Sequence, residues 1–91
     1  MQTRPEPEVP VVLEEILLKQ KWRVTYKDFD VCVLDNPNDP KARPICIPQK
    51  VGQSGKLASD IVAQILIDAK IDIITYLPLR KTVIEALEKP L

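Results

Sequence analysis

The stretch WRVTYKDFDVCVL, residues 22–34, contains the pattern that decides the fold. Apolar and polar side chains alternate on both sides of a short polar break at Lys27 and Asp28, and the residue types favour strands. An alternation with a period of two predicts two β-strands, with Trp22, Val24 and Tyr26 on one face of the first. Because the link between the strands is so short, we expect an antiparallel hairpin.

A helix is predicted immediately before the hairpin. Apolar residues recur with helical spacing through PVVLEEILLKQK, residues 10–21, and Pro10 suits the first position of a helix. We expect about three turns, with the apolar face in the core and with Glu14 and Glu15 in water. Residues 1–9 alternate proline with charge, which predicts a flexible, extended lead-in.

The chain after the hairpin is expected to add a strand and a helix. Residues 35–44, DNPNDPKARP, are rich in turn-forming residues and are predicted to form an exposed loop. The short apolar run ICIP predicts a third strand that ends at Pro48. Helical spacing then extends from Ser54 to Ile71, and Ser54 is a suitable N-cap for this helix.

The C-terminal part completes the predicted architecture. Residues 72–76, DIITY, fit either a fourth strand or the start of a helix, and a further helix is predicted from about Pro78 to Lys89. Together the elements predict an α+β fold, in which two helices pack on one face of a three-stranded antiparallel sheet and a third helix follows. We expect a single domain over residues 10–91.

Charge balance limits the partners that this chain could have. The 91 residues include 13 Lys and Arg against 13 Asp and Glu, so the net charge is zero and gives no general attraction for nucleic acid or anionic membranes. No apolar run approaches the roughly 20 residues of a membrane span, and we expect a cytoplasmic protein without a membrane partner. One acid-free basic segment stands out, residues 41–56.

The two cysteines, Cys32 and Cys46, lie in strand-like contexts, and the chain has no histidine to join them as metal ligands. Buried free thiols are the simplest interpretation, and a cross-strand disulfide is the alternative if the two strands are neighbours. Asp28 and Asp30 share a strand face, but two carboxylates are a poor metal site without further ligands. The sequence therefore indicates neither a metal nor a cofactor.

A segment with both glycines of the chain, PQKVGQSGK at residues 48–56, precedes the second helix. Its glycines are too close together for a GxxxxGK[ST] phosphate loop, and no hydroxyl residue follows Lys56. GQSG fits the GXXG pattern of KH domains, but that loop joins two helices whereas this one follows a strand. Two interpretations stay open: a tight turn with a helix cap, or an anion site at a helix N-terminus reinforced by Lys50 and Lys56.

Several of these motifs, in this order, resemble the HicA-like family of small RNA-cleaving toxins over about residues 12–73. KWR at residues 21–23 matches the family's entry into its first strand, ICIP at 45–48 its third strand, and GKL at 55–57 the start of its last helix. The resemblance implies a fold like that of double-stranded-RNA-binding domains. It also implies RNA as a ligand.

The same resemblance places the family's catalytic histidine near Asp30, where this chain departs from the pattern because it has no histidine. An imidazole exchanges protons near neutral pH, and an exposed aspartate is a poor general acid in its place. We therefore expect no RNA cleavage by the family mechanism and assign no catalytic residue.

Two functions are compatible with these patterns. The first is a non-catalytic, HicA-like protein that binds an RNA backbone. Its predicted binding residues are Lys41, Arg43, Lys50, Ser54 and Lys56. The second is a small protein-interaction module that contacts an antitoxin-like protein or a second copy of itself. For this function the apolar segment IDIITYLPL, residues 71–79, is the predicted contact.

Overall fold

Helices and strands follow one another in the order that the sequence predicts. The computed structural model describes residues 4–89. Its elements are α1 (Pro10–Lys19), β1 (Arg23–Lys27), β2 (Val31–Asp35), β3 (Ile45–Pro48), α2 (Ser59–Asp68) and α3 (Ile73–Glu88). The predicted α+β class, with a three-stranded antiparallel sheet, is confirmed.

The sheet has the order β1-β2-β3, which places β2 in the middle. Leu34 of β2 pairs with Val24 of β1 and with Ile45 of β3. A bulge between Val24 and Tyr26 then sets Tyr26 opposite Val33. Because of this extra residue, Val24 and Tyr26 lie on opposite faces of the sheet, and the prediction that they share a face was wrong.

The hairpin turn comprises Asp28–Asp30, slightly later in the chain than the predicted break. The Asp28 carboxylate accepts hydrogen bonds from the N–H groups of Asp30 at 2.8 Å and Val31 at 2.9 Å. It accepts a third from the Tyr26 hydroxyl at 2.5 Å. A carboxylate that accepts hydrogen bonds from the backbone N–H groups two and three residues later in the chain stabilises a tight turn. In this turn Phe29 lies at the tip.

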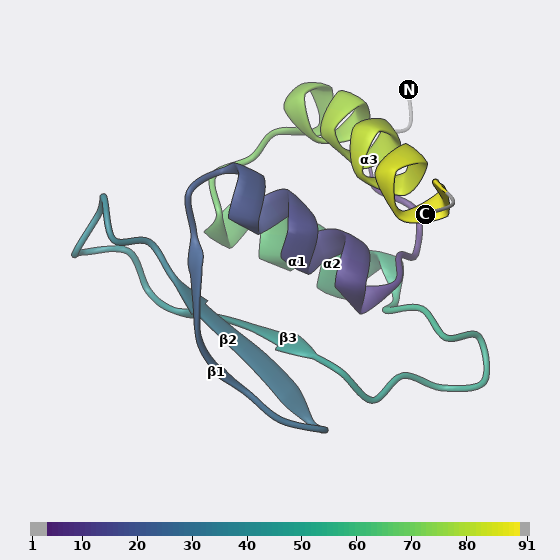
Figure 1. Cartoon of the computed structure of the whole chain (residues 1–91), viewed down its shortest axis with the longest axis horizontal. Helices are drawn as coiled ribbons and strands as arrows, with labels where there is room; N and C mark the ends of the chain where they lie inside the picture. The colour runs from purple at the N-terminus through teal and green to yellow at the C-terminus, as the bar shows by residue number, and fades with distance from the viewer. Residues whose placement is uncertain (1–3, 90–91) are drawn as a thin grey trace.

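The elements form three layers (Figure 1). Helices α1 and α2 lie on the same side of the sheet and both contact β3, while α3 packs against α1 on the side away from the sheet. Within residues 4–89, no helix covers the other face of the sheet. The core fills the space between the helices and the sheet, and its most buried side chains include Leu13, Ile16, Leu34, Ile47 and Val62.

Helix α2 begins at Ser59, with Ala58 as the N-cap residue, so the predicted start at Ser54 was wrong. Residues before it are held by other contacts. Leu57 forms an antiparallel bridge with Glu8, in which its N–H and C=O bond the Glu8 backbone at 2.7 and 3.1 Å. Gly55 has a φ of +73°, which a right-handed helix does not allow. The bridge at Leu57 and the positive φ of Gly55 therefore prevent the helix from starting before residue 58.

The open question about residues 72–76 is settled in favour of a helix. Helix α3 begins at Ile73, and the Asp72 carboxylate caps it by accepting a hydrogen bond from the Thr75 N–H at 2.8 Å. Pro78, which was predicted near the helix start, lies inside α3. None of the helices described in residues 4–89 is both long enough and apolar enough to cross a membrane.

The segment before α1 makes specific contacts with the rest of the domain. Glu8 is only 2% exposed, and its carboxylate forms an ion pair with Arg80 of α3. Pro5 is also buried, and its carbonyl accepts a hydrogen bond from the Ser59 hydroxyl. The flexibility predicted for residues 1–9 stays a prediction, and residues 1–3 lie outside the described part of the chain.

Two further expectations about exposure were wrong. Glu14 is buried rather than in water, because it faces the sheet and accepts a hydrogen bond from the Lys27 ammonium group of β1 at 2.7 Å. Cys46 is exposed whereas Cys32 is buried, and both thiols are free. Cys46 pairs with Val33, the residue next to Cys32. Side chains alternate along a strand, so the two thiols point to opposite faces and cannot form a disulfide.

Candidate functional site

The basic residues predicted to bind RNA fall into two groups that β3 separates. Lys41 and Arg43 lie in the loop between β2 and β3, whereas Lys50, Ser54 and Lys56 lie in the loop between β3 and α2. These two loops leave β3 at its opposite ends (Figure 1). The structure therefore does not gather the five residues into one patch.

The anion site predicted at a helix start does not form at Ser54. The Ser54 hydroxyl accepts a hydrogen bond from the Lys56 N–H at 3.2 Å, within a local turn. The helix that follows has no side-chain cap, and Asp60 in its first turn places a negative charge at the N-terminal end of the helix dipole. That carboxylate competes with any anion for the same position.

Asp30, the position of the family's histidine in the resemblance, is an exposed residue of the hairpin turn. Its carboxylate lies 3.0 Å from the Lys50 ammonium nitrogen. Both side chains are well exposed, so this ion pair contributes little to stability, but it partly neutralises Lys50. Residues 4–89 contain no group of three or more side chains placed to hold a metal ion.

A different surface emerges on the face of the sheet that no helix covers. We call it the outer sheet face, and it consists of side chains that alternate with the buried ones of each strand: Tyr26, Val31, Val33, Cys46 and Pro48. Val31 and Val33 are half-buried and Tyr26 is exposed. The surface is apolar in the middle of the sheet, where a soluble domain usually has polar residues.

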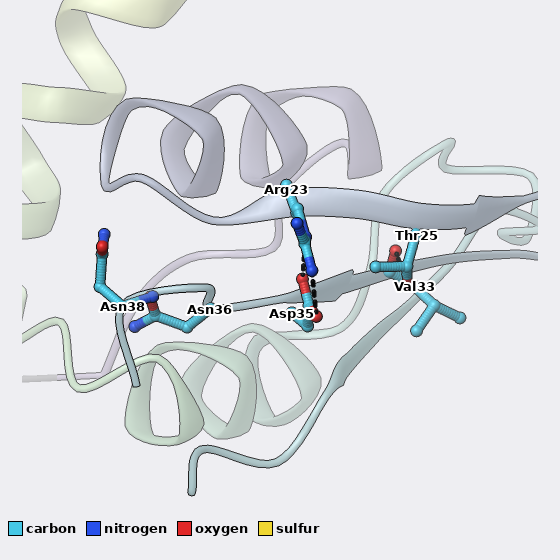
Figure 2. A network of polar contacts seen from close by, with 6 residues as sticks. All are labelled: Arg23, Thr25, Val33, Asp35, Asn36 and Asn38. Atoms are coloured by element: carbon cyan, nitrogen blue, oxygen red, sulfur yellow. Dashed lines mark hydrogen bonds and ion pairs between the residues drawn. The ribbon is translucent and has the colours of Figure 1, made fainter. Parts of the chain in front are cut away.

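Polar contacts border this face at one end (Figure 2). Arg23 of β1 reaches across to Asp35 of β2, with Nε 2.9 Å from Oδ1 and one terminal nitrogen 3.4 Å from Oδ2. The hydrogen bond to Asp35 is the main cause that raises the pKa of Arg23. Beside this pair, the Thr25 hydroxyl donates to the Val33 carbonyl at 3.3 Å. The outer sheet face is thus apolar at its centre and polar at this border.

The hairpin tip borders the other end of the face. Phe29 is 91% exposed, although the turn beneath it is held by the three hydrogen bonds to Asp28. The Tyr26 hydroxyl, followed by the backbone N–H groups of Asp30 and Val31, lowers the pKa of Asp28. The turn thus presents an aromatic ring to solvent from a well-defined backbone, which is a feature of contact residues.

Comparisons with known proteins found no matching family model, no matching curated protein and no matching solved structure. The resemblance to the HicA-like family therefore stays a prediction. The alternation of Phe29, Val31 and Val33 in the sequence was the available signal for the outer sheet face. The sequence does not say which side of the sheet the helices cover. The alternation alone therefore could not show which of the two faces is exposed.

Proposed function

We propose that this chain is a small protein-interaction module that associates with a second copy of itself through the outer sheet face. The observation that carries the proposal is the uncovered apolar centre of the sheet, with Phe29 exposed at its border. Burial of apolar side chains is the main favourable contribution to association. The face lies on strands that are paired in a three-stranded sheet, so we expect little backbone entropy to be lost on binding.

A second copy is the occupant that the charges favour. Two copies of a chain with zero net charge do not repel one another. A two-fold arrangement would place Val33 and its neighbours against the same residues of the other copy, with apolar surface meeting apolar surface. The Arg23 and Asp35 side chains already neutralise each other, so neither brings an unpaired charge to the border of this contact.

Sedimentation velocity over a range of protein concentrations tests this proposal. We expect a concentration-dependent dimer, which Val33→Lys converts to a monomer and Phe29→Ala weakens. Ile74→Lys is the matched control, because Ile74 is an exposed apolar residue of α3, and that helix packs on the side of α1 away from the sheet. A chain that stays monomeric at all concentrations, or a dimer that Ile74→Lys disrupts and Val33→Lys does not, would contradict the proposal.

Binding of an RNA backbone is a second candidate function, supported by the exposure of three basic side chains. Lys41, Arg43 and Lys56 are exposed and have no ion pair among residues 4–89. Phosphate contacts release counterions, so RNA affinity should fall steeply as salt rises and should fall again in the Lys41→Glu/Lys56→Glu variant. If no RNA binds at low salt in a filter assay, RNA binding is excluded as a function. That result would leave the dimer proposal unchanged.

A further inference from the structure

A surface cavity lies where the loop between β2 and β3 meets the C-terminal end of α2. Its volume is about 430 Å³, which is within the range of small-molecule sites. We call it the basic cavity, because more cations than acids line it: Lys41, Arg43 and Lys70 against Asp39 and Asp68. Ala42 and Ile67 complete its wall. None of its residues belongs to the outer sheet face.

The loop that carries Lys41 and Arg43 is held by its own hydrogen bonds. The Asp39 N–H donates to the Asn36 carbonyl at 3.1 Å, and the Ala42 N–H donates to the Asp39 carbonyl at 3.0 Å. Each bond joins residues three positions apart, as in a β-turn, so two turns follow one another. The backbone beneath the two cations is therefore fixed, although the loop is exposed.

Lys70 adds a third cation from the end of α2, outside the basic segment 41–56 of the sequence. Its φ is +59°, and its N–H donates to the Ile67 carbonyl at 3.0 Å, so the helix stops here. The Ile71 N–H donates to the Leu66 carbonyl at 2.9 Å. These bonds occupy carbonyl oxygens of the last turn, which reduces the negative charge that the helix end offers to the cavity.

The two acids of the basic cavity already have partners within the chain. Asp39 Oδ1 accepts a hydrogen bond from the Lys41 N–H at 3.2 Å, and Asp39 Oδ2 lies 3.9 Å from the Lys70 ammonium nitrogen. The Asp68 carboxylate accepts a hydrogen bond from the side-chain amide of Gln64, one turn earlier on α2, at 3.0 Å. Three cations against two acids leave the cavity with a net charge of +1.

We propose that the basic cavity binds a small phosphate monoester, with the phosphate on the three cations and the organic part against Ile67. Lys41 and Arg43 have no ion pair among residues 4–89, so a ligand displaces no internal partner from them. A phosphate monoester carries a charge of about −1.5 to −2 at neutral pH and has three terminal oxygens, one for each cation. Ile67 is 67% exposed and offers an apolar surface beside the phosphate position.

This ligand differs from an RNA backbone in its chemistry. A phosphodiester carries a single negative charge and has only two terminal oxygens, so it would use the three cations less fully than a monoester does. The proposal needs neither the dimer nor RNA binding. Val33→Lys should therefore leave the affinity for a monoester unchanged, and a chain that binds RNA but no monoester would overturn this proposal alone.

NMR titration of the isotope-labelled chain with AMP at low salt tests the proposal. We expect the amide signals of residues 39–43 and 67–70 to shift, and we expect weaker binding of cyclic AMP, a diester, and of inorganic phosphate. Adenosine, which has no phosphate, should not bind. No shift at millimolar AMP, or shifts confined to other residues, would overturn the proposal. Equal affinity for AMP and for any one of the three comparison ligands would also overturn it.

Two double variants separate the cavity from general charge attraction. Lys41→Gln/Lys70→Gln should weaken the affinity for AMP by about tenfold, because two charged donors are lost. Lys56→Gln/Lys81→Gln is the matched control: it removes the same charge from two exposed lysines that do not line the cavity, and it should keep the native affinity. Native affinity in the first variant, or an equal loss in both, would overturn the proposal.

Discussion

The Arg80 guanidinium of α3 donates a hydrogen bond to the buried carboxylate of Glu8, a residue 72 positions earlier in the chain. Glu8 also forms the backbone bridge with Leu57, directly before α2. One residue of the N-terminal segment thus joins the loop that leads into α2 to the outermost helix. The hydrogen bond to Glu8 is the first cause that raises the pKa of Arg80.

We predict that removing the Glu8 charge destabilises the fold. Glu8→Ala should lower the free energy of unfolding by about 2 kcal/mol, because Arg80 loses a charged hydrogen-bond partner. The loss should stay below that of a fully buried ion pair, since the Arg80 side chain is 36% exposed. Urea unfolding followed by circular dichroism measures the change. Glu6→Ala is the control, because Glu6 is exposed, and a similar loss in both variants would refute the prediction.

The hairpin, the helix before it and the strand after it could be predicted from sequence because each depends on local periodicity. The start of α2 could not, since it is set by the Leu57 bridge to Glu8, a contact between segments about 50 residues apart. Helical spacing continues through residues 54–58 in the sequence, but the backbone groups of Leu57 are used elsewhere. A tertiary contact therefore overrides the local pattern there.

The candidate surfaces were harder to predict than the fold. Burial of Glu14 depends on the Lys27 ammonium group of β1, a contact between two different elements. The bulge that turns Tyr26 outward contains neither Gly nor Pro, so the sequence carries no signal for it. The basic segment 41–56 was visible in the sequence, but its separation into two loops follows from the direction of β3 between them. A charge pattern along the chain does not say which charges meet in space.

Reactivity of the two cysteines should differ sharply in the folded protein. Burial, followed by the nearby Glu14 carboxylate, raises the pKa of Cys32 to about 11, so this thiol has little thiolate at neutral pH. Cys46 is exposed on β3. We expect iodoacetamide to modify Cys46 at pH 7.5 and to modify Cys32 only in denaturant, which mass spectrometry can follow. Cys46→Ser should abolish modification of the native chain, and rapid labelling of that variant would contradict the buried position of Cys32.

Acid should weaken the hairpin turn through Asp28. Its pKa is lowered in the folded state, chiefly by the Tyr26 hydroxyl and then by two backbone N–H groups. Protonation therefore favours the unfolded chain, and the stabilisation is complete above about pH 4 and declines as the pH falls further. Carbon NMR titration of the Asp28 carboxyl measures this pKa directly. Tyr26→Phe should raise it toward the ordinary value, and an unchanged titration in that variant would show that the hydroxyl is not bound in solution.

Pro78 occupies an interior position of α3, where it cannot donate the helical hydrogen bond to the carbonyl of Ile74. Its side chain is exposed, so Pro78→Ala removes no core contact. We expect this substitution to raise the free energy of unfolding by about 1 kcal/mol, since the restored hydrogen bond exceeds the entropy that the unfolded chain gains. Pro10→Ala provides the matched comparison: Pro10 is buried and stands at the start of α1, where proline fits, and its loss should destabilise. Thermal unfolding of both variants checks the opposite signs, and a lower melting temperature for Pro78→Ala would contradict the prediction and mean that a proline at this position is needed to seat α3 on α1.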